Sequence, residues 1–77
     1  MPNYRRFLEN LPPHLRLKVL DAIEKIVENK LDDLDIILMH GYKGFFRCRV
    51  GKIRIVFERI GSDNIVYDVG FRGGIYK

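Results

Sequence analysis

Arginines alternate with apolar residues along three runs in the second half of the chain. They are Arg47, Arg49, Arg54 and Arg72. At the two-residue period of a β-strand, each run has one apolar face and one face that carries arginine. Guanidinium groups offer a planar fork of donors that matches phosphate oxygens, so arginines gathered on one sheet face would form an anion or phosphate site. The alternative is a solvated face whose arginines pair with acids such as Glu58 and Asp68.

The same alternation predicts which residues of the three runs face a core. The predicted core-facing residues are Phe46, Cys48, Val50, Ile53, Ile55, Phe57, Ile65, Tyr67, Val69 and Phe71. Gly51-Lys52 has the composition of a two-residue type II′ turn, and residues 61–64 form a longer polar turn. A three-stranded antiparallel meander follows from these signals.

Two amphipathic helices precede the meander. Apolar residues at Tyr4, Phe7, Leu8 and Leu11 have helical spacing, and a second helix is expected from Pro13 to near Asn29. A helical hairpin packed on an antiparallel sheet is an α+β fold. Residues 31–40 are interpreted as a loop that leads into the sheet.

Composition indicates one soluble globular domain spanning residues 1–77. Residues 1–40 hold six Lys/Arg and seven Asp/Glu, a balance of −1, whereas residues 41–77 hold eight against three, a balance of +5. Positive charge concentrated with the sheet favours a polyanionic partner such as nucleic acid. No run of membrane length and no signal peptide is found, so a cytoplasmic location without membrane contact is expected.

Other chemistry-bearing residues give weaker signals. Cys48 alternates onto the predicted core face and is interpreted as a small buried apolar residue. His14 and His40 have no partners at zinc spacing, and Asp32, Asp33 and Asp35 lack the rest of a calcium loop. No metal site and no cofactor is therefore predicted.

The sheet region resembles a known family. Residues 41–57 read GYKGFFRCRVGKIRIVF, and Val69-Gly70-Phe71-Arg72 and a near-terminal Tyr76 follow. Preceded by a helical hairpin with Leu-Pro at its turn, this order is similar to RelE/ParE-superfamily toxins of bacterial toxin-antitoxin systems. The resemblance covers roughly residues 4–77. It implies a metal-independent endoribonuclease that cleaves mRNA, often on the ribosome, and a cognate antitoxin that binds and inhibits it.

The resemblance also implies roles for individual residues. Arg54 and Arg72 would hold the scissile phosphate, with Arg72 near the leaving oxygen, and Tyr76 would position or deprotonate the attacking 2′-OH. Arg47 and Arg49, with Lys43 and Lys52, would bind the RNA backbone. The general base is unassigned, because Arg does not deprotonate in proteins. The candidates are Lys43, Lys52, His40, Glu58 and Asp68.

Departures from the family pattern leave alternatives open. Only residues 1–3 precede the first helix, so the strand that family members have there is expected to be missing. The resulting open sheet edge could pair with an antitoxin strand or with a second copy of the chain. Gly73 and Gly74 make a short spacer before Tyr76. The alternatives to a nuclease are a ParE-like, non-enzymatic topoisomerase inhibitor and a degenerate toxin-like module that binds RNA or antitoxin.

Overall fold

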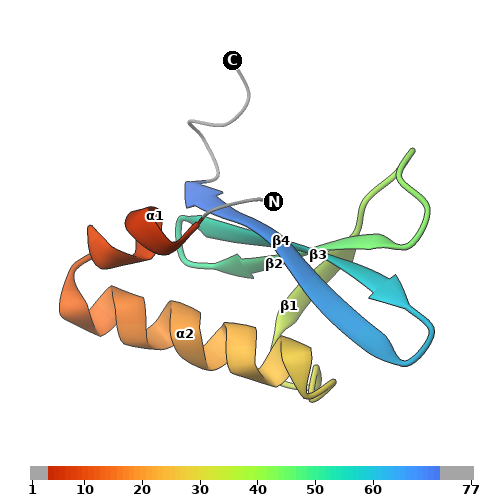
Figure 1. Cartoon of the computed structure of the whole chain (residues 1–77), viewed down its shortest axis with the longest axis horizontal. Helices are drawn as coiled ribbons and strands as arrows, with labels where there is room; N and C mark the ends of the chain where they lie inside the picture. The colour runs from red at the N-terminus through yellow and green to blue at the C-terminus, as the bar shows by residue number, and fades with distance from the viewer. Residues whose placement is uncertain (1–3, 72–77) are drawn as a thin grey trace.

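The computed structural model of the protein describes residues 4–71. Two helices are followed by four strands, and Figure 1 shows both helices on the same side of the sheet. The elements are α1 (Arg5–Glu9), α2 (Pro13–Val27), β1 (Asp35–Leu38), β2 (Phe45–Val50), β3 (Ile53–Ile60) and β4 (Asp63–Phe71). The α+β class and the helical hairpin predicted from the sequence are confirmed.

Helix α2 begins and ends where the sequence predicts. Pro13 occupies the first helical position, where a missing N–H costs no intrahelical hydrogen bond. Beyond the helix, Asn29 adopts a positive φ of 60°, its N–H bonds the Ile26 carbonyl, and the Lys30 N–H bonds the Lys25 carbonyl. This pair of bonds is a Schellman motif, which satisfies two of the last carbonyls of the helix.

The sheet has four strands, in the order β1-β2-β3-β4, and every neighbouring pair is antiparallel. The prediction of three strands was therefore wrong, because residues 35–38, interpreted as part of a loop, form β1. Three aspartates at its start gave the segment the composition of a loop, and a strand of four residues gives only a short period-two signal. Strand β1 pairs with β2, so the edge strands of the described sheet are β1 and β4. The expected absence of a strand before α1 concerns residues 1–3, which lie outside the described residues.

The turn between β2 and β3 sets the register of the sheet centre. Gly51 has a φ of +59° while Lys52 keeps a negative φ, as a type II′ turn requires. Arg49 consequently pairs with Arg54, and Cys48 pairs with Ile55. The residues of β2 and β3 predicted to face the core therefore lie on the same side of the sheet and pack in the core, as predicted.

A β-bulge changes the phase of β4. Val56 pairs with Asp68, but the next residue, Phe57, pairs with Val66, so Tyr67 has no direct partner on β3. Val66 packs against the core, although strict alternation placed it on the opposite face.

The core-facing assignments of Ile65 and Tyr67 were wrong for the same reason. Ile65 pairs with Glu58 and is 42% exposed, and Tyr67 contacts Phe45 on the face away from the helices. The assignment holds for Val69, which is buried beyond the bulge. One extra residue therefore exchanges the two faces within a single strand.

The hydrophobic core lies between the helices and the sheet. Its fully buried members include Val19 and Ile26 from α2, Cys48 from β2, and Ile55 and Phe57 from β3. Because both helices cover this face, no described helix covers the opposite face of the sheet (Figure 1).

A small polar cluster attaches the end of α2 to the β3–β4 hairpin. The buried Asn64 side chain donates to the Ile26 carbonyl at 2.9 Å and to Asn29 Oδ1 at 3.2 Å. Arg59 donates to the same Asn29 oxygen at 2.8 Å. These hydrogen bonds hold the β3–β4 hairpin against the end of α2 and so fix the position of the sheet relative to the helical layer.

Within residues 4–71, neither helix has the length and hydrophobicity needed to cross a lipid bilayer.

Candidate functional site

The face of the sheet away from the helices carries charged residues in rows. Read from β1 to β4, the rows contain Asp35, Arg49, Arg54 and Gly70, then Ile37, Arg47, Val56 and Asp68, then Phe45, Glu58 and Ile65 on the last three strands. Arg47, Arg49 and Arg54 thus lie on one face. Arg72 and Tyr76 lie outside the described residues.

The charge of Arg49 is paired. Its Nε and Nη2 atoms both lie 2.9 Å from Asp35 Oδ2, and the two residues face each other across β1 and β2. Both side chains are partly exposed, so the pair contributes little to stability. The pair matters more for the charge of the site, because the Asp35 carboxylate neutralises one of the three arginines, Arg47, Arg49 and Arg54, on this face of the sheet. This pair was not predicted, because residues 31–40 were interpreted as a loop.

The other two arginines meet in one hollow. Arg47 and Arg54 line a space of about 380 Å³ together with Ile37, Leu38, Met39, His40 and Tyr42. We call this space the arginine hollow. Arg54 is only 6% exposed, although it lies opposite the helical layer, and Arg47 is half-buried. The alternation of residues predicted a solvent-exposed face at this position. The structure shows a partly enclosed one, because residues of β1 and of the loop after it line the hollow on one side.

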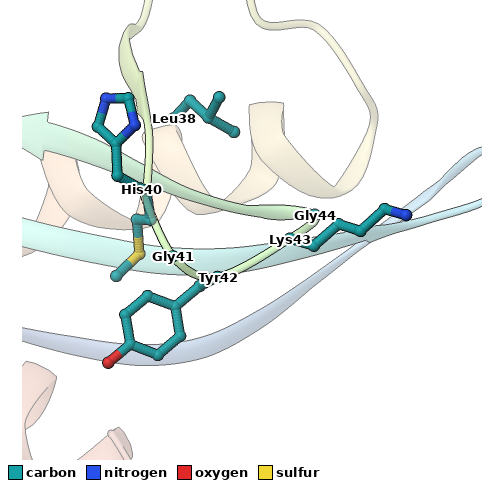
Figure 2. Close-up of a pocket in the computed structure, with 7 residues that line it drawn as sticks. Leu38, His40, Gly41, Tyr42, Lys43 and Gly44 are labelled. Atoms are coloured by element: carbon teal, nitrogen blue, oxygen red, sulfur yellow. The ribbon is translucent and has the colours of Figure 1, made fainter.

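The loop after β1 contributes Met39, His40 and Tyr42 to the lining of the arginine hollow. Residues 39–44 connect β1 to β2, and the Met39 N–H bonds the Phe45 carbonyl at 3.0 Å where the loop closes. Figure 2 shows a second hollow, of about 380 Å³, lined by residues 38–44. In Figure 2, the Lys43 side chain points away from the Tyr42 ring.

Three further candidates for RNA binding or proton transfer are exposed, and one of them lines the arginine hollow. Lys43 is exposed in the loop, and Lys52 is exposed in the β2–β3 turn and does not line the arginine hollow. His40 is exposed and does line the hollow. His14 is exposed in the first turn of α2, as expected from the sequence.

A chain of aromatic rings adjoins the arginine hollow. The ring centroids of Tyr42 and Phe45 are 6.5 Å apart, and those of Phe45 and Tyr67 are 5.3 Å apart. Tyr67 forms a side-chain hydrogen bond to Glu58, which together with the negative charge of that carboxylate raises the pKa of Tyr67 above its usual value. Sequence reasoning missed Tyr67, because the bulge that turns it to this face has no recognisable pattern in the sequence.

Cys48 lies under the arginine face as a buried thiol. It is fully buried, and desolvation followed by the negative charge of Asp35 raises the pKa of the Cys48 thiol from 9.0 to about 11. The protonated thiol is a poor nucleophile, so Cys48 acts as an apolar core residue. The prediction made from its position in the strand is confirmed.

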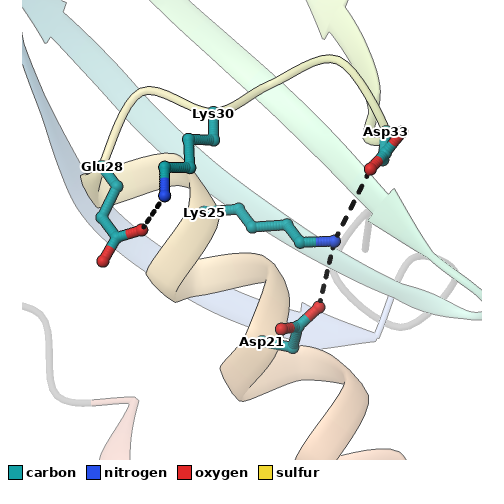
Figure 3. Close-up of polar contacts among 5 residues, drawn as sticks. All are labelled: Asp21, Lys25, Glu28, Lys30 and Asp33. Carbon is teal, nitrogen blue, oxygen red and sulfur yellow. Dashed lines mark ion pairs between the residues drawn. The ribbon is translucent and has the colours of Figure 1, made fainter.

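The acidic residues of the α2–β1 connection engage in ion pairs. Figure 3 shows Lys25 between Asp21, at 3.3 Å, and Asp33, at 4.0 Å, and Lys30 beside Glu28 at 3.4 Å. Across the part of the chain that the structure describes, no three His, Cys, Asp or Glu side chains form a group able to hold a metal ion. These carboxylates therefore organise the surface of α2.

The similarity of the whole chain to known proteins identifies its family. No protein-family model matches the chain. Over 72 residues it is 38% identical to Toxin RelE3 of Methanocaldococcus jannaschii, an alignment that covers 90% of this chain and 82% of that protein. The chain belongs to the RelE family of toxins. Its fold is also similar to the crystal structure of the RelB-RelE antitoxin-toxin complex from Methanococcus jannaschii, with a TM-score of 0.75, 33% identity, and coverage of 90% of this chain and 84% of that one.

Membership of the RelE family agrees with the sheet and helical hairpin described above. The similarity extends over 90% of the chain, in agreement with the resemblance that the sequence shows over roughly residues 4–77. The arginine hollow and the aromatic rings beside it are features of this chain that the pattern of residue types did not indicate.

Because the Cys48 thiol is buried, we predict that the free energy of unfolding falls at high pH. A pKa raised in the folded state means that ionisation favours unfolding, so stability that is present below pH 9 is lost as the pH rises toward 11. The difference in unfolding free energy between wild type and Cys48→Ala should shrink by up to about 3 kcal/mol from pH 8 to pH 11.

Urea unfolding of both proteins at each pH measures this difference. Lysine and tyrosine titrations affect both proteins equally and cancel in the comparison. A difference that stays constant across this range would show that the thiol ionises as easily in the folded protein as in the unfolded one.

Proposed function

We propose that this RelE-family toxin is an endoribonuclease that cleaves mRNA by attack of a 2′-OH on the adjacent phosphate. The observation that carries the proposal is the meeting of Arg47 and Arg54 in one hollow. Two guanidinium groups from neighbouring strands can contact the same phosphate from two directions. Family membership and the net charge of +4 support a polyanionic substrate.

The proposed chemistry needs no metal ion. The 2′-oxygen attacks phosphorus, a phosphorane with added negative charge forms, and the bond to the 5′-oxygen breaks as that oxygen takes up a proton. Donors held in place before the reaction stabilise the developing charge without having to reorganise. Arg54 fits this role best among the described residues, because its burial fixes the guanidinium beside the hollow.

The surroundings of the hollow strengthen this electrostatic effect. Ile37, Leu38 and Met39 supply apolar walls, and Arg54 is almost completely removed from water. Coulomb interactions grow as the effective dielectric constant falls, so a phosphate placed here would interact more strongly with the arginines than on an open surface.

The remaining roles follow the resemblance. Arg72 would act with Arg54 on the phosphate, near the leaving oxygen, and Tyr76 would position or deprotonate the 2′-OH. Arg47 would bind the RNA backbone, and so would Lys43, which is exposed in the loop after β1 and lines the second hollow. Arg49 and Lys52 would contribute less than the sequence suggested, because Asp35 neutralises the first and the second lies away from the hollow.

We also propose a proton acceptor. Of the five candidates named from the sequence, His40 is the one that lines the arginine hollow. Imidazole exchanges protons near neutral pH as a residue class. His40 is therefore the leading candidate.

We further propose that a cognate antitoxin inhibits the protein. The similar structure is a complex of RelE with RelB, which supports a protein partner of that kind. Ribosome-bound mRNA in the cytoplasm is the proposed target. Pairing of two copies through a sheet edge stays a prediction, and the edges of the described sheet are β1 and β4.

Substitution of Arg54 tests the proposed reaction. Because Arg54 is buried, Arg54→Met preserves most of its packing while removing the donors. We expect at least about a hundredfold slower cleavage, the loss typical when a preorganised donor to the transition state is removed. Mapping of mRNA 5′ ends after induction in cells, and cleavage of mRNA on purified ribosomes and free in solution, measure the effect.

Arg16→Ala is the matched control, since it removes one arginine from helix α2 on the other layer. It should cleave like wild type. Growth arrest by the wild type with intact transcripts would contradict the nuclease and favour a topoisomerase inhibitor. No effect of the wild type on growth or transcripts would indicate a degenerate module.

The Arg49–Asp35 pair predicts an unusual effect of removing an acid. Asp35→Asn releases Arg49 for contact with a phosphate, so RNA affinity at low salt should rise. The slope of log affinity against log salt should become steeper by up to about 0.7, the contribution of one added phosphate contact on a single strand. Fluorescence anisotropy with a labelled RNA strand at several salt concentrations measures the slope.

Asp33→Asn makes the same change in net charge at a residue that pairs with Lys25 instead. It should leave the slope unchanged. Equal slopes for wild type and Asp35→Asn would show that Arg49 does not contact RNA.

A further inference from the structure

We propose that Tyr42, Phe45 and Tyr67 form a binding site for an unpaired nucleobase of single-stranded RNA, next to the arginine hollow. We call these three residues the aromatic track. The proposal rests on the proposed function, because it assigns the base of the same RNA strand whose phosphate would occupy the hollow.

The track is continuous and begins at the hollow. Tyr42 lines the arginine hollow and contacts Phe45, and Phe45 contacts Tyr67. Phe45 and Arg47 are two residues apart on β2 and therefore share one face of the sheet. A strand that places a phosphate against Arg47 and Arg54 would bring a neighbouring base over the track.

Packing within the track leaves aromatic surface exposed. Tyr42 is 61% exposed as a residue, and Phe45 and Tyr67 are half-buried. Both ring pairs are inclined, at 73° and 46°, so the rings do not cover one another face to face. By contrast, Phe46 and Phe57 on the helix side stack at 19°, and Phe57 is only 1% exposed.

The combination of exposed rings and cations favours RNA as the occupant. Proteins bind single-stranded RNA by stacking unpaired bases on aromatic side chains of an open sheet face while arginines hold the backbone. An apolar protein segment would cover the rings but would supply no phosphate to the arginine hollow beside them. A nucleotide supplies both groups, since it joins a flat apolar ring to a phosphate.

Glu58 gives the track a polar end. Glu58 lies opposite Phe45 on β3, and its carboxylate raises the pKa of the neighbouring Tyr67. An ionised carboxylate has further lone pairs and no donor, so it can bind an N–H group on the edge of a base stacked on Phe45. The bulge at Tyr67 turns the tyrosine to the face that carries Glu58.

Abasic scanning of a short RNA tests the track. The probe is a labelled hexanucleotide with 2′-fluoro sugars, which cannot be cut by its own 2′-OH, and one abasic residue is moved through the strand. We expect one position at which the abasic residue weakens binding to wild type about tenfold, the loss typical of one base stacked on an aromatic ring. A duplex of the same sequence should bind more weakly than the single strand.

Variants of the track identify the residues involved. Tyr42→Leu and Tyr67→Leu should each bind the intact strand about as weakly as wild type binds the abasic strand, and should lose the abasic penalty. Tyr42 lies in an exposed loop, so Tyr42→Leu tests the track even if Tyr67→Leu unfolds. Phe7→Leu, which changes an aromatic residue on the helical layer, should behave like wild type.

The outcomes separate this inference from the proposed function. An abasic strand that binds wild type as tightly as the intact strand at every position would overturn the track, even if the protein cuts mRNA. A position-specific abasic penalty in a protein that cuts no mRNA would retain the track and overturn the nuclease. Preference for the duplex, or unchanged binding in both leucine variants, would also overturn the track.

Discussion

The antiparallel register between β2 and β3 is the constraint on which the candidate site depends. The two-residue turn at Gly51-Lys52 places Arg49 opposite Arg54, and every other pair of the hairpin follows from that alignment. Side chains alternate at every residue, so a slip by one position would exchange the faces of a whole strand. The core residues Cys48, Ile53 and Ile55 prevent such a slip, because it would expose them and bury the arginines. The same apolar contacts that stabilise the fold therefore place the cations.

The helical layer and the functional face divide the sheet between them. On one side, α1 and α2 bury the apolar face, and the polar cluster of Asn29, Arg59 and Asn64 fastens α2 to the β3–β4 hairpin. On the other side, residues of β1 and of the loop after it lie beside Arg47 and Arg54 and form the arginine hollow with them. This arrangement explains how a chain of 77 residues builds a partly enclosed site without a second domain.

The sequence predicted the parts of this arrangement that depend on local pattern. Helix α2, the type II′ turn and the common face of Arg47, Arg49 and Arg54 follow from the spacing of apolar residues and from glycine chemistry. The sequence did not predict β1, whose four residues follow an acidic segment and are recognised as a strand only through pairing with β2.

The other differences also depend on contacts between residues distant in the sequence. The bulge at Tyr67 depends on how β4 pairs with β3 over its whole length, and it moved Ile65 and Tyr67 to the opposite face. The pairing of Arg49 with Asp35 and the burial of Arg54 depend on the strand that was missed. The family resemblance was correct because it rested on the order of several short motifs, which is more specific than any one of them.

The most direct measurement is an NMR titration of the arginine side chains with inorganic phosphate. The Nε atoms of Arg47 and Arg54 are buried, so their N–H groups exchange slowly enough with water to be observed. If the two arginines form one anion site, their Nε–H signals will shift together and report one dissociation constant, while the Arg16 signal on α2 stays still. Separate dissociation constants for the two, or equal shifts for Arg16, would contradict the account.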